Sequence, residues 1–254
     1  MPLESSAQYR TMPAQINQQL LKSHLPKLLD LADVHDQSFS FYDGGVERRA
    51  LIGWYTNNAP LDVLGNMAVA WGVPQQFVQQ WQRGAEGTEG IGLSINQDLT
   101  AIKLYTHKWM GVTLEDVGVP VYRGFKLLAD QTLRVDDYVN AGDLRSNGNL
   151  AYALALGSQP SWVEALHAAA PQDKPLLFTK TNNTSRNSWL ATARYADLQA
   201  DAVAGPAFGG FPLLHLAGGV DAVKGQFSSI YIQTTLSDVN DFINGNVFAL
   251  DGVH

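Results

Sequence analysis

The sequence predicts an α+β protein in which antiparallel β-hairpins close into a barrel covered by helices. Two observations carry this prediction. β-runs joined by tight turns alternate with helical stretches along the chain, and the β-runs have one polar and one apolar face. Sequential hairpins favour antiparallel pairing, and closure into a barrel removes the exposed edges of an open sheet.

The first half of the chain contains two units of helix plus hairpin. Apolar residues at helical spacing predict a helix over 14–32, which Pro26 is expected to kink or interrupt. Residues 38–56 form two β-runs around an Asp-Gly-Gly turn, which predicts the first hairpin. A Gly-Val-Pro sequence interrupts the helical pattern of 60–82, so two helices are expected there. A second hairpin is expected over 90–109.

The second half continues the same alternation. We expect a third hairpin over 119–139, a helix over 149–169 and a fourth hairpin with a polar tip over 175–196. A helix is expected near 212–223, followed by a late strand over 226–235. No linker divides the chain, and we expect one domain comprising all 254 residues.

Strand alternation separates the residues of two hairpins into two faces. On one strand of the first hairpin, Arg48 shares a face with apolar residues, and the other face holds Glu47, Arg49, Leu51, Gly53 and Tyr55. In the second hairpin, Lys103, Tyr105 and His107 occupy every second position between apolar residues. The pattern predicts an apolar exterior under helices and a polar, aromatic lumen. The alternative is an ordinary half-buried sheet whose polar face meets solvent.

Composition excludes several classes of function. A formal net charge of −7 argues against a nucleic-acid-binding surface, which needs many Lys and Arg residues. The absence of cysteine excludes disulfides and thiolate metal sites, and the six histidines lack metal-ligand spacing. We therefore expect no protein-ligated metal. With no signal-peptide pattern and no membrane-spanning run, a soluble, cytoplasmic and monomeric protein is expected.

Four stretches of the chain resemble the ABBA prenyltransferases, specifically those acting on cyanobactin-type ribosomal peptides. They are DQSFSFYDGGVERRALIGWY, GIGLSINQDLTAIKLYTHKW, PLLFTKTNNTSRNSWLATARYADL and, more weakly, VPVYRGFKLL with the late SSIYIQ. The resemblance implies a ten-stranded antiparallel barrel ringed by helices, whose lumen holds an isoprenyl diphosphate beside an electron-rich acceptor. The implied acceptor is a peptide or an aromatic side chain, and the implied donor is dimethylallyl diphosphate.

The resemblance also implies roles for individual residues. The acidic residue of the family pattern corresponds to Asp36, although the family more often has Glu there. It is the implied catalytic base. The residues implied to bind diphosphate are Arg49, Lys103, Tyr105, Lys180, Arg194 and Tyr231. Further implied lumen residues are Glu47, Tyr55, His107 and Tyr195. Arg194 and Tyr195 are adjacent, so both line the lumen only if a bulge intervenes.

These residue types suit allylic transfer. Lys and Arg stabilise the charge that develops on a departing diphosphate, and aromatic faces attract the allylic cation. A carboxylate accepts the proton of the acceptor. Any Mg²⁺ is expected to bind through the diphosphate oxygens. Two other functions fit the residues as well: a non-catalytic barrel that binds a hydrophobic anion, and a structural or interaction protein.

Overall fold

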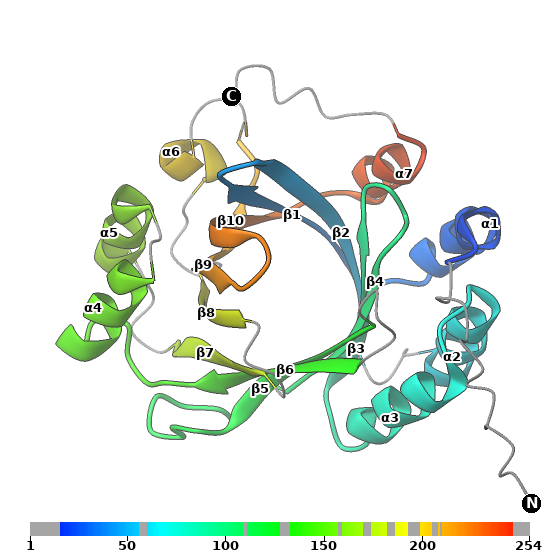
Figure 1. Cartoon of the computed structure of the whole chain (residues 1–254), viewed down its shortest axis with the longest axis horizontal. Helices are drawn as coiled ribbons and strands as arrows, with labels where there is room; N and C mark the ends of the chain where they lie inside the picture. The colour runs from blue at the N-terminus through cyan, green and yellow to red at the C-terminus, as the bar shows by residue number, and fades with distance from the viewer. Residues whose placement is uncertain are drawn as a thin grey trace, which may run out of the picture.

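Every predicted hairpin is present in the computed structural model of the chain, and the strands close into a barrel (Figure 1). The structure describes residues 16–55, 60–108, 111–127, 133–156, 159–169, 174–181, 186–192, 199–204, 208 and 210–245. The strands are β1 (Val34–Tyr42), β2 (Gly45–Tyr55), β3 (Gly90–Asn96), β4 (Ile102–His107), β5 (Pro120–Leu127), β6 (Leu133–Asn140), β7 (Leu176–Thr181), β8 (Arg186–Thr192), β9 (Leu213–Asp221) and β10 (Gly225–Gln233). The predicted ten-stranded antiparallel barrel is confirmed.

The order of the strands is the simplest that a barrel allows. Each strand pairs with its neighbours in sequence, and β1 pairs with β10 to close the ring. The hydroxyl oxygens of Ser40 and Ser229 lie 2.6 Å apart across this closing pair, although the residues are 189 positions apart. In the first turn Gly45 has a φ of 138°, a conformation that only glycine adopts readily. The Asp-Gly-Gly sequence therefore fixes the first hairpin.

The helices lie outside the barrel and cover its apolar face (Figure 1). They are α1 (Gln18–Leu29), α2 (Leu61–Ala70), α3 (Gln75–Ala85), α4 (Asn147–Ala155), α5 (Pro160–Ala169), α6 (Ala200–Ala204) and α7 (Leu236–Ile243). α1 runs through Pro26 without ending there, and the expected break in 60–82 separates α2 from α3. Neither α6 nor α7 was predicted.

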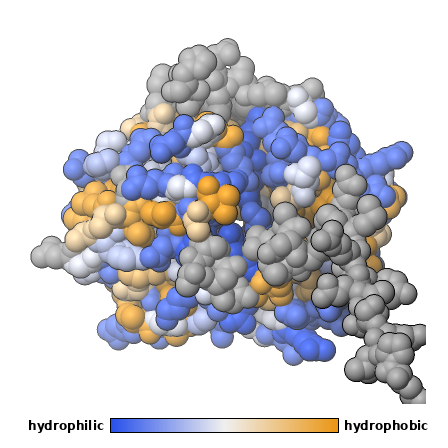
Figure 2. Space-filling view, in the orientation of Figure 1, coloured by the Kyte–Doolittle hydropathy of each residue, from blue (hydrophilic) through white to orange (hydrophobic). Residues whose placement is uncertain are grey.

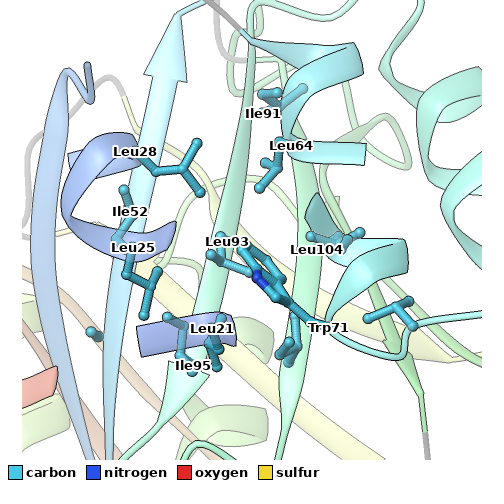
Figure 3. Packing of buried hydrophobic residues seen from close by; sticks show 14 of the residues in the cluster. Leu21, Leu25, Leu28, Ile52, Leu64, Trp71, Ile91, Leu93, Ile95 and Leu104 are labelled. Carbon is cyan, nitrogen blue, oxygen red and sulfur yellow. The ribbon is translucent and has the colours of Figure 1, made fainter. Parts of the chain in front are cut away.

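Two apolar cores lie between the helices and the strands. The first joins α1, α2, α3 and α7 to β2, β3 and β4, and Figure 3 shows leucines of α1 and Trp71 beside the outward side chains of these strands. The second joins α4, α5 and α6 to β1 and the strands from β7 to β10. Each fully buried Leu or Ile contributes about 1.5–3 kcal/mol, so the helices stabilise the barrel that they surround.

Arg48 is a cation on the outer, apolar face of the barrel. Its guanidinium donates two hydrogen bonds to Gln37 Oε1, of 3.0 and 2.8 Å, and lies 5.2 Å from the Phe242 ring centroid. These contacts satisfy a charged group that is almost fully buried. Arg48 is therefore held by contacts with Gln37 and Phe242 on the outer face and takes no part in the lumen.

Two elements differ from the sequence prediction. Residues 149–169 were expected to form one helix, but α4 ends at Ala155 and α5 begins at Pro160, the first-turn position that proline favours. The predicted helix near 212–223 is wrong, because these residues form β9. Both faces of β9 are buried, which removes the alternation typical of a strand. A Cβ on Gly219 would lie 2.2 Å from the Asn187 carbonyl oxygen, so the close approach of β8 requires glycine there.

Candidate functional site

A cavity of about 140 Å³ lies in the lumen, and five of the site residues named from the sequence line it. Asp36 comes from β1, Arg49 from β2, Lys103 and Tyr105 from β4, and Tyr231 from β10. Their neighbours along each strand face the outer cores, as the period of a strand requires. The alternative in which these polar faces meet solvent on an ordinary sheet is therefore excluded.

A second cavity of about 210 Å³ adjoins the first. Tyr55 and His107 line it, together with Glu89 and Lys174. Tyr55 is 45% exposed, so this cavity meets solvent at its rim. Four residues line both cavities and mark their junction: Asp36, Tyr105, Tyr122 and His215.

The remaining sequence-derived site residues do not line either cavity. Lys180 is exposed on the outer face of β7, since it alternates with Thr179, whose hydroxyl contacts Ser188 inside the barrel. Its predicted place in the lumen is wrong. Glu47 lies beside the inner cavity, where it bonds Arg49. Arg194 and Tyr195 lie outside the described residues.

Several cavity residues were not identified from the sequence: Tyr42, Tyr122, Tyr138, Arg186 and His215. Arg186 stands at the start of β8, in the same polar hairpin tip that suggested Lys180. Only the register shows which of the two points inward, because directly paired residues share a face of the sheet. Lys180 pairs with Asp137 on the outer face, and Arg186 pairs with Asp221 on the inner face. The sequence predicts a helix at His215, but the residue lies on β9, where a bulge beside it brings both Leu214 and His215 to the second cavity.

The three polar residues of β4 lie flat across glycines of the neighbouring strands. A Cβ on Gly124 would lie 1.9 Å from Lys103 Cε, and a Cβ on Gly92 would lie 2.0 Å from Tyr105 Cζ. A Cβ on Gly90 would likewise lie 2.0 Å from a ring nitrogen of His107. These glycines let the long side chains of β4 reach sideways along the wall and leave the centre of the lumen open.

Gly92→Ala is expected to destabilise the protein. The new methyl group would overlap the half-buried Tyr105 ring, which donates a hydrogen bond of 3.3 Å to the Ile52 carbonyl and cannot move without losing it. Overpacking of this kind costs about 1–3 kcal/mol in the free energy of unfolding, measured by urea titration. Gly44→Ala is the matched control, because a Cβ there meets nothing within 4 Å. Equal costs for the two variants would contradict the packing argument.

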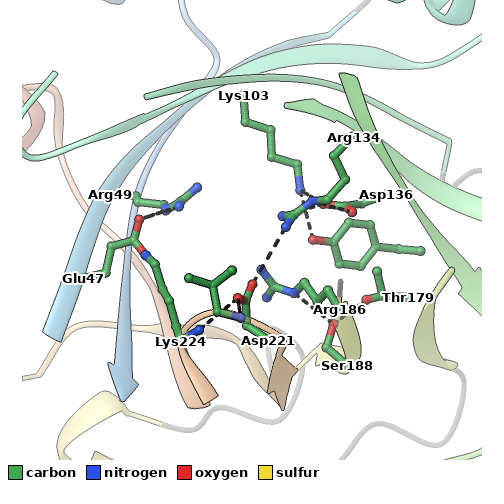
Figure 4. A network of polar contacts seen from close by, with 12 residues as sticks. Glu47, Arg49, Lys103, Arg134, Asp136, Thr179, Arg186, Ser188, Asp221 and Lys224 are labelled. Carbon is green, nitrogen blue, oxygen red and sulfur yellow. Dashed lines mark hydrogen bonds and ion pairs between the residues drawn. The ribbon is translucent and has the colours of Figure 1, made fainter. Parts of the chain in front are cut away.

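Charged side chains gather at one end of the inner cavity (Figure 4). Lys103 Nζ lies 3.4 Å from Asp136 Oδ2 and 3.0 Å from the Tyr138 hydroxyl. Arg134 Nη2 donates to Asp136 Oδ2 at 3.1 Å, whereas its Nε lies 3.0 Å from Oδ1 without hydrogen-bond alignment. Asp136 is fully buried and therefore depends on these two cations.

A second group of ion pairs continues this network. Glu47 accepts hydrogen bonds from Arg49 and, at 2.6 Å, from Lys224 in the turn between β9 and β10. Asp221 lies 3.8 Å from Arg134. Among the described residues, the network contains three carboxylates against five cations, which are Arg49, Lys103, Arg134, Arg186 and Lys224, together with the amine of Lys126. This end of the lumen is thus positive in a chain whose net charge is −7, as an anion site requires.

The network shifts the pKa values of its members. Burial opposes ionisation of Asp136, but Lys103 and Arg134 hold its pKa below the ordinary value. Burial likewise raises the pKa of the Tyr138 hydroxyl, yet the charges of Lys103 and Arg186 outweigh it, and the net shift is downward. By contrast, burial raises the pKa of Tyr231, with a further contribution from Tyr138. The Tyr138 hydroxyl therefore loses its proton more easily than an ordinary tyrosine, whereas the Tyr231 hydroxyl stays protonated and can donate a hydrogen bond.

Aromatic rings connect the two cavities. His107 contacts both Tyr55 and Tyr122, with ring centroids 6.1 and 5.9 Å apart, and His215 lies between Tyr122 and Tyr231 at 6.4 and 5.8 Å. Burial lowers the pKa of His107, although Glu89 opposes the shift, so its ring is neutral at neutral pH. Neutral rings of this kind can surround a cation without repelling it.

The described residues contain no group of three or more His, Cys, Asp or Glu side chains arranged to hold a metal ion. Asp36 lines the inner cavity, and the two carboxylates beside the cavity, Glu47 and Asp136, are already paired with cations. These residues do not fit a divalent metal held by the protein alone. Within the part of the chain that the structure describes, no helix combines the length and apolarity needed to cross a membrane.

Comparison with known proteins identifies the fold. No protein-family model matches the sequence, and no curated protein matches it. The ternary complex of the prenyltransferase PriB with L-tryptophan and dimethylallyl thiolodiphosphate matches with a TM-score of 0.52 and 11% identity, over 85% of this chain and 95% of that chain. The complex of PriB with product diphosphate matches with a TM-score of 0.51 and 9% identity, over 89% and 96%. AnaPT from Neosartorya fischeri matches with a TM-score of 0.50 and 11% identity, over 80% and 78%.

These identities are low, so the likeness concerns the arrangement of the strands and helices. The closed ring of ten antiparallel strands, the helices around it and the polar lumen agree with that likeness. The chain therefore has the ABBA barrel fold that its sequence resemblance implied.

Proposed function

We propose that this protein transfers an isoprenyl group, most suitably dimethylallyl, from its diphosphate to an electron-rich acceptor in the lumen. One observation carries the proposal. A single cavity has Arg49, Lys103 and Arg186 among tyrosines at one end, and the carboxylate of Asp36 where it meets the second, solvent-facing cavity. An anionic leaving group and a proton-releasing acceptor need these two kinds of group, held apart.

The cations of the inner cavity bind the diphosphate in this proposal. Arg49, Lys103 and Arg186 line the cavity directly, and each can donate charge-assisted hydrogen bonds to phosphate oxygens. When the allylic carbon–oxygen bond breaks, its electron pair leaves with the diphosphate, and these preorganised cations stabilise the added charge. Tyr138 on β6 and Tyr231 on β10 also line the cavity and supply hydroxyl groups to the same oxygens.

The aromatic rings act on the allylic cation, which is the other product of ionisation, and Asp36 acts on the acceptor. The rings of Tyr105, Tyr122 and His215 face the space where the allylic cation forms, attract it and exclude water that would quench it. The acceptor enters through the second cavity and forms the new bond to the allylic carbon. Asp36, which lines both cavities, then takes the proton that the acceptor loses.

We propose a peptide or an aromatic amino-acid side chain as the acceptor. The solvent-facing rim of the second cavity, where Tyr55 is exposed, leaves room for an acceptor larger than the cavity itself. The resemblance of the sequence to the cyanobactin enzymes favours a ribosomal peptide, and the L-tryptophan in the PriB complex favours an aromatic side chain. Any Mg²⁺ that accompanies the donor would bind to its phosphate oxygens.

Mass spectrometry tests the proposal. The protein is incubated with unlabelled or deuterated dimethylallyl diphosphate and a panel of peptides and free aromatic amino acids, and diphosphate release is measured in parallel. We expect a prenyl mass gain on one acceptor class, with the isotope shift of the donor. Tight donor binding with neither diphosphate release nor a mass gain would instead support the alternative, a non-catalytic barrel for a hydrophobic anion.

A further inference from the structure

Three basic side chains form a row across neighbouring strands at the charged end of the lumen. Lys103 on β4 pairs directly with Lys126 on β5, and Lys126 pairs directly with Arg134 on β6. All three point inward, since Lys126 lies two positions from Gly124, which lines the inner cavity. Directly opposed like charges on one face of a sheet destabilise each other.

The carboxylates near this row serve the residues at its two ends. Asp136 contacts both Lys103 and Arg134. Lys126, between them, has no ion pair with any residue that the structure describes. The charges of two residues on β2 also act on it: Arg49 adds a like charge, and Glu47 is bonded to Arg49 and Lys224. Lys126 is therefore a partly buried amine with three cations around it.

This environment opposes protonation of the amine. Burial is the largest effect, and the charges of Arg49 and Arg134 add to it, so the pKa of Lys126 falls to about 6. At neutral pH the amine is thus mostly neutral in the free protein. A diphosphate bound at Arg49 and Lys103, both neighbours of Lys126, would bring several negative charges to the row and reverse the balance.

We propose that Lys126 is a further residue of the donor site, neutral in the free protein and protonated when a diphosphate binds. The proton comes from solvent and forms an N–H bond on the ζ-nitrogen, and no other bond changes. The inference rests on the proposed function, because it takes the inner cavity as a diphosphate site. With a neutral Lys126, the row carries two positive charges before the diphosphate binds, on Lys103 and Arg134, and three afterwards. Repulsion within the row is therefore smaller in the free protein.

Calorimetry with inorganic pyrophosphate tests this directly. Binding is measured at pH 7.5 in two buffers that differ in ionisation enthalpy, for the parent protein, Lys126→Met and Lys126→Gln. The parent should take up about one proton more than either variant, the difference between an amine of pKa about 6 and a fully protonated one. Titration of pyrophosphate itself cancels in this comparison. Lys180→Met, which removes an exposed lysine from the outer face of β7, should match the parent.

The outcomes separate the two claims. If pyrophosphate binds and the parent and Lys126 variants take up equal numbers of protons, the role of Lys126 is refuted and the proposed donor site stands. If pyrophosphate does not bind the parent protein, the donor site itself is refuted, and the inference falls with it. Extra proton uptake in the parent alone supports both.

Stability gives a second readout that needs no ligand. The pKa of Lys126 is about 6 in the folded protein, against an ordinary 10.5, so between these pH values the unfolded chain binds the extra proton. This group therefore lowers the free energy of unfolding progressively as the pH falls from 10.5 to 6. Lys126→Met removes the effect, so urea unfolding should find a stability gain over the parent that grows from pH 9.5 to pH 6.5. A difference that does not vary with pH would overturn the inference.

Discussion

Asp36→Asn is expected to lower the rate of prenyl transfer by about 10²- to 10⁴-fold, the range attributed to general base catalysis. Asp36 lies at the junction of the two cavities, close enough to Tyr105 that its charge adds to the burial that raises the Tyr105 pKa. The amide keeps the size of the side chain but cannot accept the proton. Donor binding should change little, because the cations stand at the other end of the inner cavity.

Product analysis makes this prediction specific. Ionisation of the donor depends on the cations, so hydrolysis to the prenyl alcohol should persist in Asp36→Asn. Asp36→Glu should retain more transfer than Asn, since it keeps a carboxylate. Asp43→Asn, in the exposed turn of the same hairpin, is the matched control. Transfer at the parental rate across the pH range would exclude Asp36 as the base. His215, which also lines both cavities, would then be the next candidate for the base. Glu47 is less suited to that role, because Arg49 and Lys224 already donate hydrogen bonds to its carboxylate.

Arg49→Ala and Lys103→Ala are expected to weaken donor binding or turnover by about 1.5–3 kcal/mol each, on the order of 10- to 150-fold. Both residues line the inner cavity from different hairpins, and each would lose charge-assisted hydrogen bonds to the diphosphate. Donor affinity is measured by calorimetry and turnover by diphosphate release. Lys180→Ala is the control for loss of a lysine outside the lumen.

The two variants differ in their effect on folding. Arg49→Ala frees Glu47, which keeps Lys224 as a partner. Lys103→Ala leaves the fully buried Asp136 with Arg134 alone, so it should also lower the free energy of unfolding. Adding Asp136→Asn to Lys103→Ala removes the unbalanced charge and should restore part of the stability without restoring donor affinity. Unchanged donor kinetics in both single variants would refute the assignment of the diphosphate site.

The sequence was most informative where a strand has two different faces. On β2 and β4, apolar residues alternate with polar ones, because one face packs under helices and the other lines the lumen. That alternation was enough to place Arg49, Lys103 and Tyr105 inside the barrel. The prediction failed for β9, where both faces are buried and the sequence has the uniform hydrophobicity of a core helix.

Residues in polar segments were also beyond prediction. Lys180 and Arg186 stand in one hairpin tip with similar neighbours, and nothing local says which of them points inward. The register with β6 and β9 decides it, and register depends on contacts between segments far apart in the chain. The same holds for Asp136, because its partner Lys103 comes from β4, whereas Arg134 lies two residues away on the same strand. The network of charges therefore had to be read from the fold.

The pairing of β1 with β10 has a consequence for how the protein is made. Ser40 and Ser229 are separated by 189 positions. At about 5–20 residues per second of translation, β1 waits about 10–40 s before its partner leaves the ribosome. Throughout that interval the nascent sheet has two unpaired edges, which are open to pairing with other chains. A chaperone that holds the growing chain should therefore raise the yield of soluble protein more than one that acts after release.

Arg49 and Tyr231, on strands made early and late, meet only once synthesis has passed β10, so a ribosome-bound chain stalled before that strand should not bind pyrophosphate.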